Sequence, residues 1–311
     1  MNTWNVQPLD SYRLGQYQLP LPCLLCGENN LIDATSCRNC TAPMEMTRIM
    51  NEAKKTRPQI IATLGAPGVG KSVYLGMLLD ILTRQRDRSD VTTLGTSSVD
   101  LQQTTVAALT RGEFPEPTPK NPEEWTWAHC QLSRSTRKTP LEVFLPDISG
   151  AAVVQEYEHR KSYPVIPGLV SKSTGLMLFV DSSRVQEGDK DEEFFALKLL
   201  QYFEEIQIQE AKRTKKRRKR APNSHVAIVL AKADRSDECR HRTADFVRGQ
   251  MAALWQHCED QLPSHRFFAA SAVGACATVK DRREFDVTIP LRVEPQGVIE
   301  PFRWLLGKIV G

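Results

Sequence analysis

Eight consecutive residues, from Gly65 to Ser72, carry the most specific chemistry in this chain of 311 residues. They fit the pattern G-x-x-x-x-G-K-S/T, in which glycines let backbone N–H groups wrap a β-phosphate. Lys71 would reach the β- and γ-phosphate oxygens, and Ser72 would ligate Mg²⁺. The pattern predicts a nucleoside triphosphate held by the loop and the start of the next helix: Ala66, Pro67, Gly68, Val69, Gly70, Lys71, Ser72 and Val73.

The segments on either side are those that such a loop requires. Residues 59–64 form a short apolar run, which predicts a buried strand. After the loop, apolar residues recur at helical spacing: Val73, Met77, Leu78 and Ile81. A helix that starts at the loop adds the positive end of its dipole to the phosphate site. A chance glycine turn is the weaker alternative.

Three further polar motifs each follow a predicted strand. They are Asp147-Ile148-Ser149-Gly150, Ala231-Lys232-Ala233-Asp234 and Ser271-Ala272-Val273. Because an open α/β sheet binds its ligands at the carboxyl ends of the strands, we expect all three in one site. Asp147 can hold Mg²⁺ through a water, and Gly150 leaves room for its N–H to face a γ-phosphate.

Asp234 carries the argument for a particular base. Guanine presents two donors, N1–H and the exocyclic amine, and one carboxylate can accept from both. Adenine has an acceptor at N1, which would repel that carboxylate. The alternative is that Lys232 and Asp234 form only a solvated ion pair on a loop.

In their order, the four motifs resemble those of the translation-factor and Ras-like (TRAFAC) class of P-loop GTPases, over residues 59–311. The resemblance implies that the stem of Lys232 lies along the base. It also implies that the Ser271-Ala272 segment offers the backbone N–H of Ala272 to guanine O6.

The same resemblance requires a switch threonine before the next strand, with its hydroxyl on Mg²⁺ beside Ser72 and Asp147. Thr118 stands at the expected distance, whereas other threonines lie further back: Thr92, Thr93, Thr96, Thr104 and Thr105. The alternative for Thr118 is a solvated residue in a proline-rich loop.

Two positions depart from that class. Ala231 replaces the Asn or Thr that tethers the base loop to the phosphate loop, which predicts reduced guanine affinity. Ala151 follows Gly150 where Ras-like proteins carry the glutamine that orients the attacking water. With Lys71, Thr118 and Gly150 as the catalytic residues, we expect hydrolysis to be slow. Otherwise it would need a residue from elsewhere or an arginine from a partner.

Four of the eight cysteines form two C-x₂-C pairs with ten residues between them: Cys23, Cys26, Cys37 and Cys40. Four thiolates complete a tetrahedral Zn²⁺ site, and with no open position the site is structural. An iron centre of rubredoxin type is the alternative. A module of this size cannot fold on apolar burial alone, so the metal should stabilise it, and its expected role is docking to a protein or, as an alternative, to nucleic acid.

The formal net charge of +4 is unevenly distributed. Residues 212–220 alone carry eight positive charges, so the remainder of the chain carries a net charge of −4. This basic tract is predicted to be a solvated insertion, with an anionic membrane or nucleic acid as alternative ligands. The chain has no apolar run of membrane-spanning length and starts without the pattern of a signal peptide, so we expect a cytoplasmic protein.

The predicted fold is α/β, with a mostly parallel P-loop NTPase sheet, one antiparallel hairpin strand, and helices on both faces. Strands are expected over 59–64, 125–132, 141–145, 175–181, 226–230 and 266–270, with a strand-capable stretch at 281–295, and helices over 194–208, 243–262 and around 302–309. Residues 84–122 read as loop-rich. The expected domains are an N-terminal arm (1–22), a zinc ribbon (23–48), a linker (49–58) and a GTPase domain (59–311) with a basic insertion (211–222).

An N-terminal cysteine module before such a domain, which here ends near Gly297-Val298-Ile299-Glu300-Pro301-Phe302, is similar to the bacterial double-GTPase proteins. This resemblance implies a protein partner, either a second GTPase or an activating protein. Together the motifs predict a GTP-binding switch that cycles between GTP and GDP with Mg²⁺ and carries Zn²⁺. The alternatives are a P-loop ATPase, if base reading has decayed at Ala231, and a non-hydrolysing module that recruits a partner.

Overall fold

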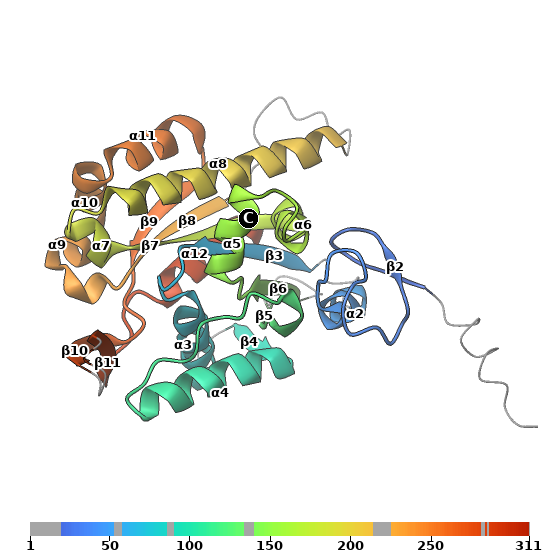
Figure 1. The fold of residues 1–311 in the computed structure, drawn as a ribbon, viewed down its shortest axis with the longest axis horizontal. Coiled ribbons are helices and arrows are strands. Elements are labelled where there is room, and N and C mark those ends of the chain that lie inside the picture. Colours follow the sequence, from blue (N-terminus) through green and yellow to red (C-terminus); the bar gives the residue numbers. More distant parts are fainter. Residues whose placement is uncertain are drawn as a thin grey trace, which may run out of the picture.

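A seven-stranded sheet in the order β4-β5-β6-β3-β7-β8-β9 runs through the centre of the protein (Figure 1). The structure is a computed structural model that describes residues 20–52, 58–85, 90–133, 140–213, 225–280, 284 and 286–310. The strands are β3 (Gln59–Gly65), β4 (Val91–Leu94), β5 (Trp127–Leu132), β6 (Leu141–Pro146), β7 (Ser173–Asp181), β8 (His225–Ala231) and β9 (His265–Ala269). Strand β5 runs antiparallel to both of its neighbours, and the remaining pairs in this sheet are parallel. The predicted α/β sheet with one antiparallel hairpin strand is confirmed.

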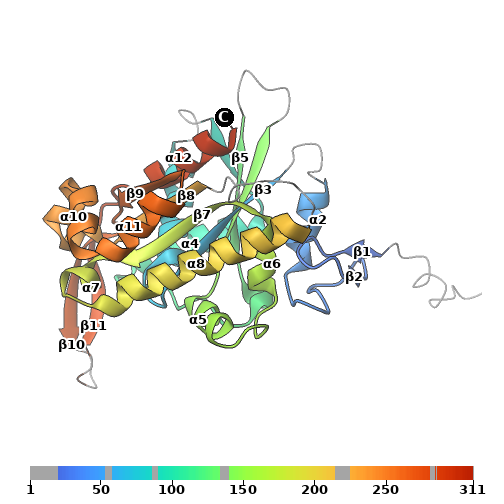
Figure 2. The same cartoon turned by 90° about the horizontal axis from the view of Figure 1, so that it is seen from above.

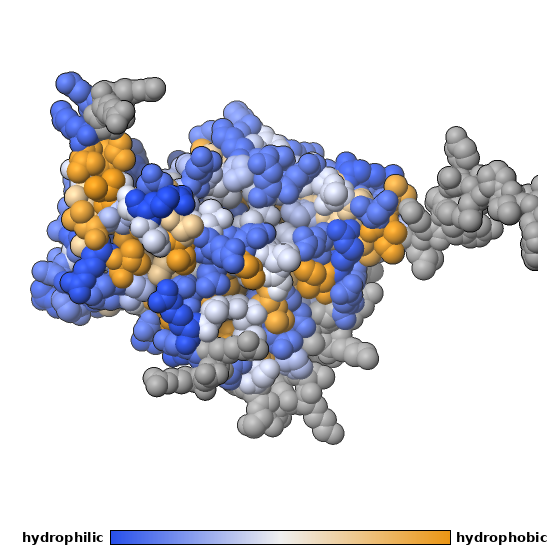
Figure 3. Space-filling model, turned by 90° about the horizontal axis from the view of Figure 1, so that it is seen from below, coloured by the Kyte–Doolittle hydropathy of each residue, from blue (hydrophilic) through white to orange (hydrophobic). Residues whose placement is uncertain are grey.

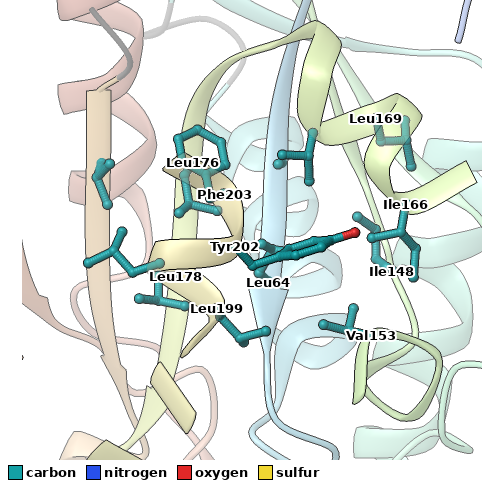
Figure 4. Close-up of a cluster of buried hydrophobic side chains, with 14 of the residues drawn as sticks. Leu64, Ile148, Val153, Ile166, Leu169, Leu176, Leu178, Leu199, Tyr202 and Phe203 are labelled. Atoms are coloured by element: carbon teal, nitrogen blue, oxygen red, sulfur yellow. The ribbon is translucent and has the colours of Figure 1, made fainter. Parts of the chain in front are cut away.

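The central strands are apolar on both sides because each one serves two cores. Along β3, Ile60, Ala62 and Leu64 point into one core, and Ile61 points into the other. Figure 4 shows part of the first core, where Leu64 and Leu178 of the sheet lie among side chains of the covering helices, such as Leu199. Because β3 is buried on both of its faces, residues 59–64 form a nearly continuous apolar run in the sequence.

Helices cover both faces of the sheet (Figures 1 and 2). The first core is closed by α5 (Gly150–Glu158), α6 (Val165–Lys172), α8 (Lys190–Arg213), α10 (Thr243–Gln250) and α11 (Ala252–Gln261). The second is closed by α3 (Lys71–Arg84), α4 (Thr96–Thr110) and α12 (Ile299–Val310). Short turns of helix also lie in this part of the chain: η3 (Pro122–Glu124), α7 (Ser182–Gln186), η4 (Ala233–Arg235) and α9 (Asp237–His241).

The expectation that residues 84–122 are loop-rich is wrong over much of its length, because β4 and α4 lie there. Helix α4 buries mainly small or hydroxylated residues, among them Ser98 and Thr105, so it lacks an apolar stripe. It packs closely on α3, where a Cβ at Gly76 would lie only 2.1 Å from Thr105 Oγ1. Close packing through small side chains leaves little periodicity for a sequence pattern to reveal.

The single helix expected over residues 243–262 is wrong in its continuity. Met251 adopts a non-helical backbone and separates α10 from α11. The carboxylate of Glu193, from α8, accepts hydrogen bonds from the backbone N–H groups of Ala253 and Leu254 at 2.9 and 3.2 Å. This carboxylate from a distant helix satisfies the free N–H groups at the start of α11.

A two-stranded antiparallel hairpin stands beside the central sheet, formed by β10 (Gly274–Lys280) and β11 (Asp286–Val293). The sequence indicated only the second strand, within residues 281–295. Exposed apolar side chains gather on this hairpin, where Leu291 is 63% exposed and Val279, Val287 and Val293 are also exposed. Figure 3 shows them as an apolar surface at one end of the molecule.

The four-cysteine module packs directly on the sheet domain. It consists of β1 (Leu21–Pro22), β2 (Asn29–Asn30), the cysteine turns and α2 (Met44–Glu52). Its buried residues belong to the same apolar cluster as α6, and a Cβ at Gly168 of α6 would lie 3.0 Å from Leu25 Cβ. Ser36 Oγ donates to Glu123 Oε1 at 2.7 Å, which joins the module to η3. Helix α2 ends at Glu52, inside the segment expected as linker.

Several predictions from the sequence concern residues outside the described ranges. Within the predicted basic tract, only Lys212 and Arg213 are described, at the end of α8. Most of the predicted N-terminal arm also lies outside these ranges. Among the described helices, none combines the length and apolar character needed to span a bilayer.

Candidate nucleotide-binding site

The glycine-rich loop joins β3 to α3 in the order that the sequence predicted. Gly68 and Gly70 have φ angles of +75° and +100°, a left-handed conformation that residues with a Cβ rarely adopt. Helix α3 begins at Lys71, immediately after Gly70. The loop therefore presents the N-terminus of a helix of 14 residues, which is a favourable environment for an anion.

Lys71 is the first residue of α3, and its side chain is buried against this loop, so that the residue is 5% exposed. Its Nζ donates hydrogen bonds to the carbonyl oxygens of Gly65 and Ala66, at 3.0 and 3.2 Å. Burial lowers the pKa of Lys71 to about 8, although the charges of Asp147 and Glu192 oppose the shift. A buried cation of this kind gains a strong partner when a phosphate group binds.

Ser72, Thr118 and Asp147 come together from three separate elements. Ser72 Oγ lies 2.6 Å from Thr118 Oγ1, and Thr118 Oγ1 donates to Asp147 Oδ2 at 2.9 Å. Burial raises the pKa of Asp147, although Ser72, Lys71 and Thr118 oppose the shift. The other carboxylate oxygen, Asp147 Oδ1, is buried and has no hydrogen-bond partner among the described residues.

This group of oxygens fits a small divalent cation. Mg²⁺ prefers oxygen ligands and keeps several of its waters, so a carboxylate and two hydroxyls suffice beside phosphate oxygens. The unpartnered Asp147 Oδ1 is a buried acceptor that such a hydrated ion would satisfy. The structure thus brings together the three residues that the sequence had assigned to Mg²⁺.

Gly150 lies directly against the glycine-rich loop. A Cβ at this position would come 2.7 Å from the backbone nitrogen of Pro67 and 2.9 Å from the carbonyl oxygen of Ala66. Because both atoms belong to the backbone, only glycine fits without moving the loop. Helix α5 therefore starts in contact with the glycine-rich loop, and Ala151 is its second residue.

The predicted base-binding motifs also meet. Asp234 Oδ1 accepts a hydrogen bond from Ser271 Oγ at 2.6 Å, and Ser271 Oγ in turn accepts from the N–H of Gly274 at 2.9 Å. The backbone N–H of Ala233 donates to the carbonyl oxygen of Ala270 at 3.1 Å. These bonds hold the Asp234 loop and the Ser271 loop as one unit.

Lys232 has a partner that sequence reasoning missed. Its Nζ lies 2.5 Å from Asp181 Oδ2, at the end of β7. Although burial opposes its ionisation, the hydrogen bond and charge of Lys232 hold the pKa of Asp181 below its ordinary value. Asp181 also caps α7 by accepting from the N–H of Ser183. Asp181 is the last residue of a predicted strand, and this position is the sequence feature that could have identified it as a site residue.

One cavity of about 440 Å³ joins all of these motifs. Its wall includes the loop from Pro67 to Val73, the segment from Phe114 to Thr118, and Gly150, Lys232, Asp234 and Ala272. Asp147 and Ser271 are not in the wall. Asp147 is hydrogen-bonded to the wall residue Thr118, and Ser271 is hydrogen-bonded to the wall residue Asp234. Other wall residues, which the sequence had not indicated, include Phe114, Arg235, Cys276 and Thr288.

The four N-terminal cysteines form a second candidate site. Their sulfur atoms all lie within 4.8 Å of one another, with Cys23 and Cys40 at 3.7 Å and Cys26 and Cys37 at 3.5 Å. A tetrahedral zinc site with bonds of about 2.3 Å has sulfur–sulfur edges of about 3.8 Å, so the donor set fits this ion. The predicted clustering of the cysteines is confirmed.

Asn30 supports this cluster and was not anticipated. Its side-chain nitrogen donates to Cys37 Sγ at 3.5 Å, and its side-chain oxygen accepts from the N–H of Arg38 at 2.9 Å. Such hydrogen bonds to a ligand orient it toward the metal. Two neighbouring asparagines, Asn29 and Asn30, lie between the cysteine pairs, and the sequence does not show which one supports a ligand, because only the fold turns Asn30 toward the thiol.

The fold and the ordered motifs are those of a GTPase-like domain. The family model Double-GTPase 1 matches residues 62–288, which is more than half of the chain. The chain therefore belongs to the Double-GTPase 1 family, and the resemblance to double-GTPase proteins is confirmed. A comparison with curated protein sequences finds no significant match.

Comparison with solved structures finds GTP-binding proteins of low identity. A putative nucleolar GTP-binding protein 1 from Plasmodium falciparum is 13% identical, with a TM-score of 0.37, over 81% of this chain and 87% of that one. The GTPase-like domain of Ski7 from S. cerevisiae, bound to GTP, is 14% identical, with a TM-score of 0.42, over 82% and 50%. Roco2 RocCORdC from Methanosarcina barkeri, bound to GDP, is 12% identical, with a TM-score of 0.35, over 81% and 49%.

Proposed function

We propose that this protein is a GTP-binding switch that hydrolyses GTP slowly or on stimulation by a partner. The observation that carries the proposal is the single cavity that joins Lys71, Thr118 and Asp234. Its volume of about 440 Å³ lies within the range of small-molecule sites, roughly 300–1,000 Å³. Membership of the Double-GTPase 1 family supports the same conclusion.

In this proposal the nucleotide lies across the ends of four parallel strands. The triphosphate occupies the loop after β3, with Lys71 on its β- and γ-oxygens. The base lies at the other end, where Asp234 accepts from guanine N1–H and the amine, the stem of Lys232 covers one face, and the N–H of Ala272 donates to O6. The bond from Ser271 to Asp234 supports this assignment, because it fixes the carboxylate that would read the base.

Ser72, Thr118 and Asp147 would hold Mg²⁺, which when bound would offset negative charge on the phosphates. The backbone N–H of Gly150 would face the γ-phosphate, because its Cα already lies against the loop. Thr118 and Gly150 would thus both respond to the presence of that phosphate. Release of inorganic phosphate after hydrolysis would free the segments that carry them, as in other γ-phosphate switches.

The four-cysteine module, with Zn²⁺ bound by Cys23, Cys26, Cys37 and Cys40, would dock a protein partner. The hydrogen bond from Ser36 to Glu123, a residue shortly after Thr118 in the chain, supports a coupling of this module to the proposed switch. The partner is a second GTPase or an activating protein, and the protein acts in the cytoplasm. Contact with an anionic membrane or a nucleic acid through residues 212–220 stays a prediction.

The test is the identity of the bound nucleotide. Protein purified without added nucleotide should release GDP or GTP on denaturation, as resolved by chromatography. In competition against labelled GTP, unlabelled ATP should be far weaker than unlabelled GTP. The variant Lys71→Ala should lose binding, whereas Lys308→Ala, in the terminal helix, should retain it. Equal competition by ATP would contradict the guanine assignment, and unchanged affinity in Lys71→Ala would contradict the site.

A further inference from the structure

The glutamine that orients the attacking water in Ras-like proteins has no counterpart at Ala151, but the next turn of the same helix carries Gln155. These two residues are four positions apart on α5. Residues at this spacing lie on the same face of a helix, one above the other. The face of α5 that lies beside the glycine-rich loop at Ala151 therefore carries Gln155 one turn further along.

A second cavity of about 440 Å³ lies along this face. Its wall includes Pro67 of the glycine-rich loop, Lys120, and Ala151 and Gln155 of α5. Pro67 and Ala151 also belong to the wall of the nucleotide cavity. The two cavities thus adjoin at the start of α5, and Gln155 faces the open space next to the place proposed for the γ-phosphate.

The direction of side chains on a helix would allow the Gln155 side chain to extend toward the proposed position of the γ-phosphate. Side chains on an α-helix lean toward its N-terminus, so Gln155 covers the turn that begins at Ala151. The methyl group of Ala151 leaves this path open. In the structure, the Gln155 amide oxygen accepts from Tyr163 Oη at 3.5 Å, which is the outer limit of a hydrogen bond, so little energy holds it away.

The other polar residues of the second cavity fit the role less well. Glu158 carries a negative charge, which the triphosphate would repel. His159 lies beyond the last residue of α5, two turns from Ala151. Lys120 can attract the phosphate but, as a cation with donors only, cannot accept a hydrogen bond from a water. An amide both donates and accepts, so it can hold a water and contact a phosphate oxygen at once.

We propose that Gln155 is the catalytic residue that orients the attacking water in GTP hydrolysis. The water oxygen forms a bond to the γ-phosphorus while the bond from that phosphorus to the bridging β-phosphate oxygen breaks. The electron pair of the broken bond stays on GDP, and the proton of the water ends on inorganic phosphate. Gln155 accepts a hydrogen bond from the water and gains or loses no proton itself.

The inference rests on the proposed GTPase function, and single-turnover hydrolysis of bound GTP tests it. Gln155→Ala should slow hydrolysis about 10²-fold, the order of loss that misplacement of a reacting group causes, with unchanged GTP affinity. Adding Ala151→Gln to that variant should restore much of the rate, which a structural role would not allow. Gln256→Ala, at an exposed glutamine bonded to Asp260 on α11, should leave the rate unchanged.

The outcomes separate the two proposals. If the unaltered protein hydrolyses GTP and Gln155→Ala does so at the same rate, the role of Gln155 is wrong. If Gln155→Ala loses GTP affinity together with the rate and Ala151→Gln restores neither, Gln155 is structural and the inference is again wrong. If the unaltered protein binds GTP but does not hydrolyse it over hours, the proposed hydrolysis fails, whatever Gln155 contributes.

Discussion

Thr118 Oγ1 lies 2.6 Å from Ser72 Oγ, although 46 residues separate the two positions in the chain. Ser72 belongs to the first turn of α3, whereas Thr118 lies in the segment that leads to η3. Both hydroxyls adjoin the buried carboxylate of Asp147. The proximity of Thr118 to Ser72 therefore links the segment expected to switch with the loop expected to hold phosphate.

Thr118→Ala should weaken GTP binding in the presence of Mg²⁺ about tenfold, equivalent to about 1.4 kcal/mol, because one oxygen ligand is lost. GTP affinity would be measured with excess Mg²⁺ and again with a chelator. The difference between the mutant and the unaltered protein should shrink when the metal is removed. Thr118→Ser, which keeps the hydroxyl, should bind nearly as the unaltered protein does. Equal loss with and without Mg²⁺ would argue against a metal ligand.

The burial of Lys71 predicts a stability that depends on pH in the nucleotide-free protein. Its pKa is about 8 in the fold and 10.5 ordinarily, so between these values the unfolded state binds more protons and stability rises with pH. Below pH 8 the fold must keep the charge buried, at a cost of about 3 kcal/mol.

Lys71→Met should therefore be more stable than the unaltered protein at pH 7, by up to about 3 kcal/mol. The advantage should diminish as the pH rises through 8 and vanish above about 10.5. Urea unfolding of both proteins at pH 7, 8.5 and 10 measures this difference. A Lys71→Met protein that is no more stable at pH 7 would show that the two carbonyl contacts already compensate for the burial.

Asp234→Asn should weaken GTP binding and improve binding of xanthosine triphosphate, because the amide reverses one donor and one acceptor. A bidentate contact to a base contributes about 1–3 kcal/mol, so roughly a 5- to 150-fold change in each affinity is expected. The control is Asp237→Asn, since Asp237 is an exposed carboxylate three residues further on. Parallel loss of both nucleotides would mean that Asp234 supports the loop rather than reads the base.

The four-cysteine cluster should contain one zinc per chain, measured by elemental analysis of the purified protein. Replacing Cys23 and Cys37 by serine should remove the metal and lower the melting temperature, because the module shares its apolar cluster with α6. Cys276→Ser tests specificity, since that thiol lies outside the cluster and should leave the zinc content unchanged. Iron in place of zinc would favour the rubredoxin-type alternative.

Gly150→Ala should reduce both stability and GTP affinity, because the added methyl group would lie 2.7 Å from the backbone nitrogen of Pro67. Overpacking of this kind costs about 1–3 kcal/mol. The control is Gly307→Ala in α12, where an added Cβ meets nothing within 4 Å. That change should leave GTP affinity unaltered and stabilise the helix by up to about 1 kcal/mol. A Gly150→Ala protein with normal affinity would show that the loop can yield.

Elements with strong local signals could be predicted from the sequence. The strand at 59–64, the glycine-rich loop and the helix after it follow from apolar runs, left-handed glycines and helical spacing, all within one short stretch. Helix α4 could not be found in this way, because its packing on α3 uses Ser98 and Thr105 rather than an apolar stripe. The break at Met251 was equally hidden, since the carboxylate that caps α11 comes from Glu193 in another helix.

By itself, the sequence determined which kinds of chemistry to expect in this protein: a glycine-rich loop of the phosphate-binding pattern, an ordered set of strand-end motifs, and four thiols in two C-x₂-C pairs. These depend on residue type and short spacing, which the chain order preserves. Only the tertiary structure decided which side chains meet: Thr118 with Ser72, Lys232 with Asp181, and Gln155 along the face of Ala151. Such contacts depend on how parallel strands align their carboxyl ends and on how helices pack across them. No short sequence pattern determines how far apart two such side chains lie in space.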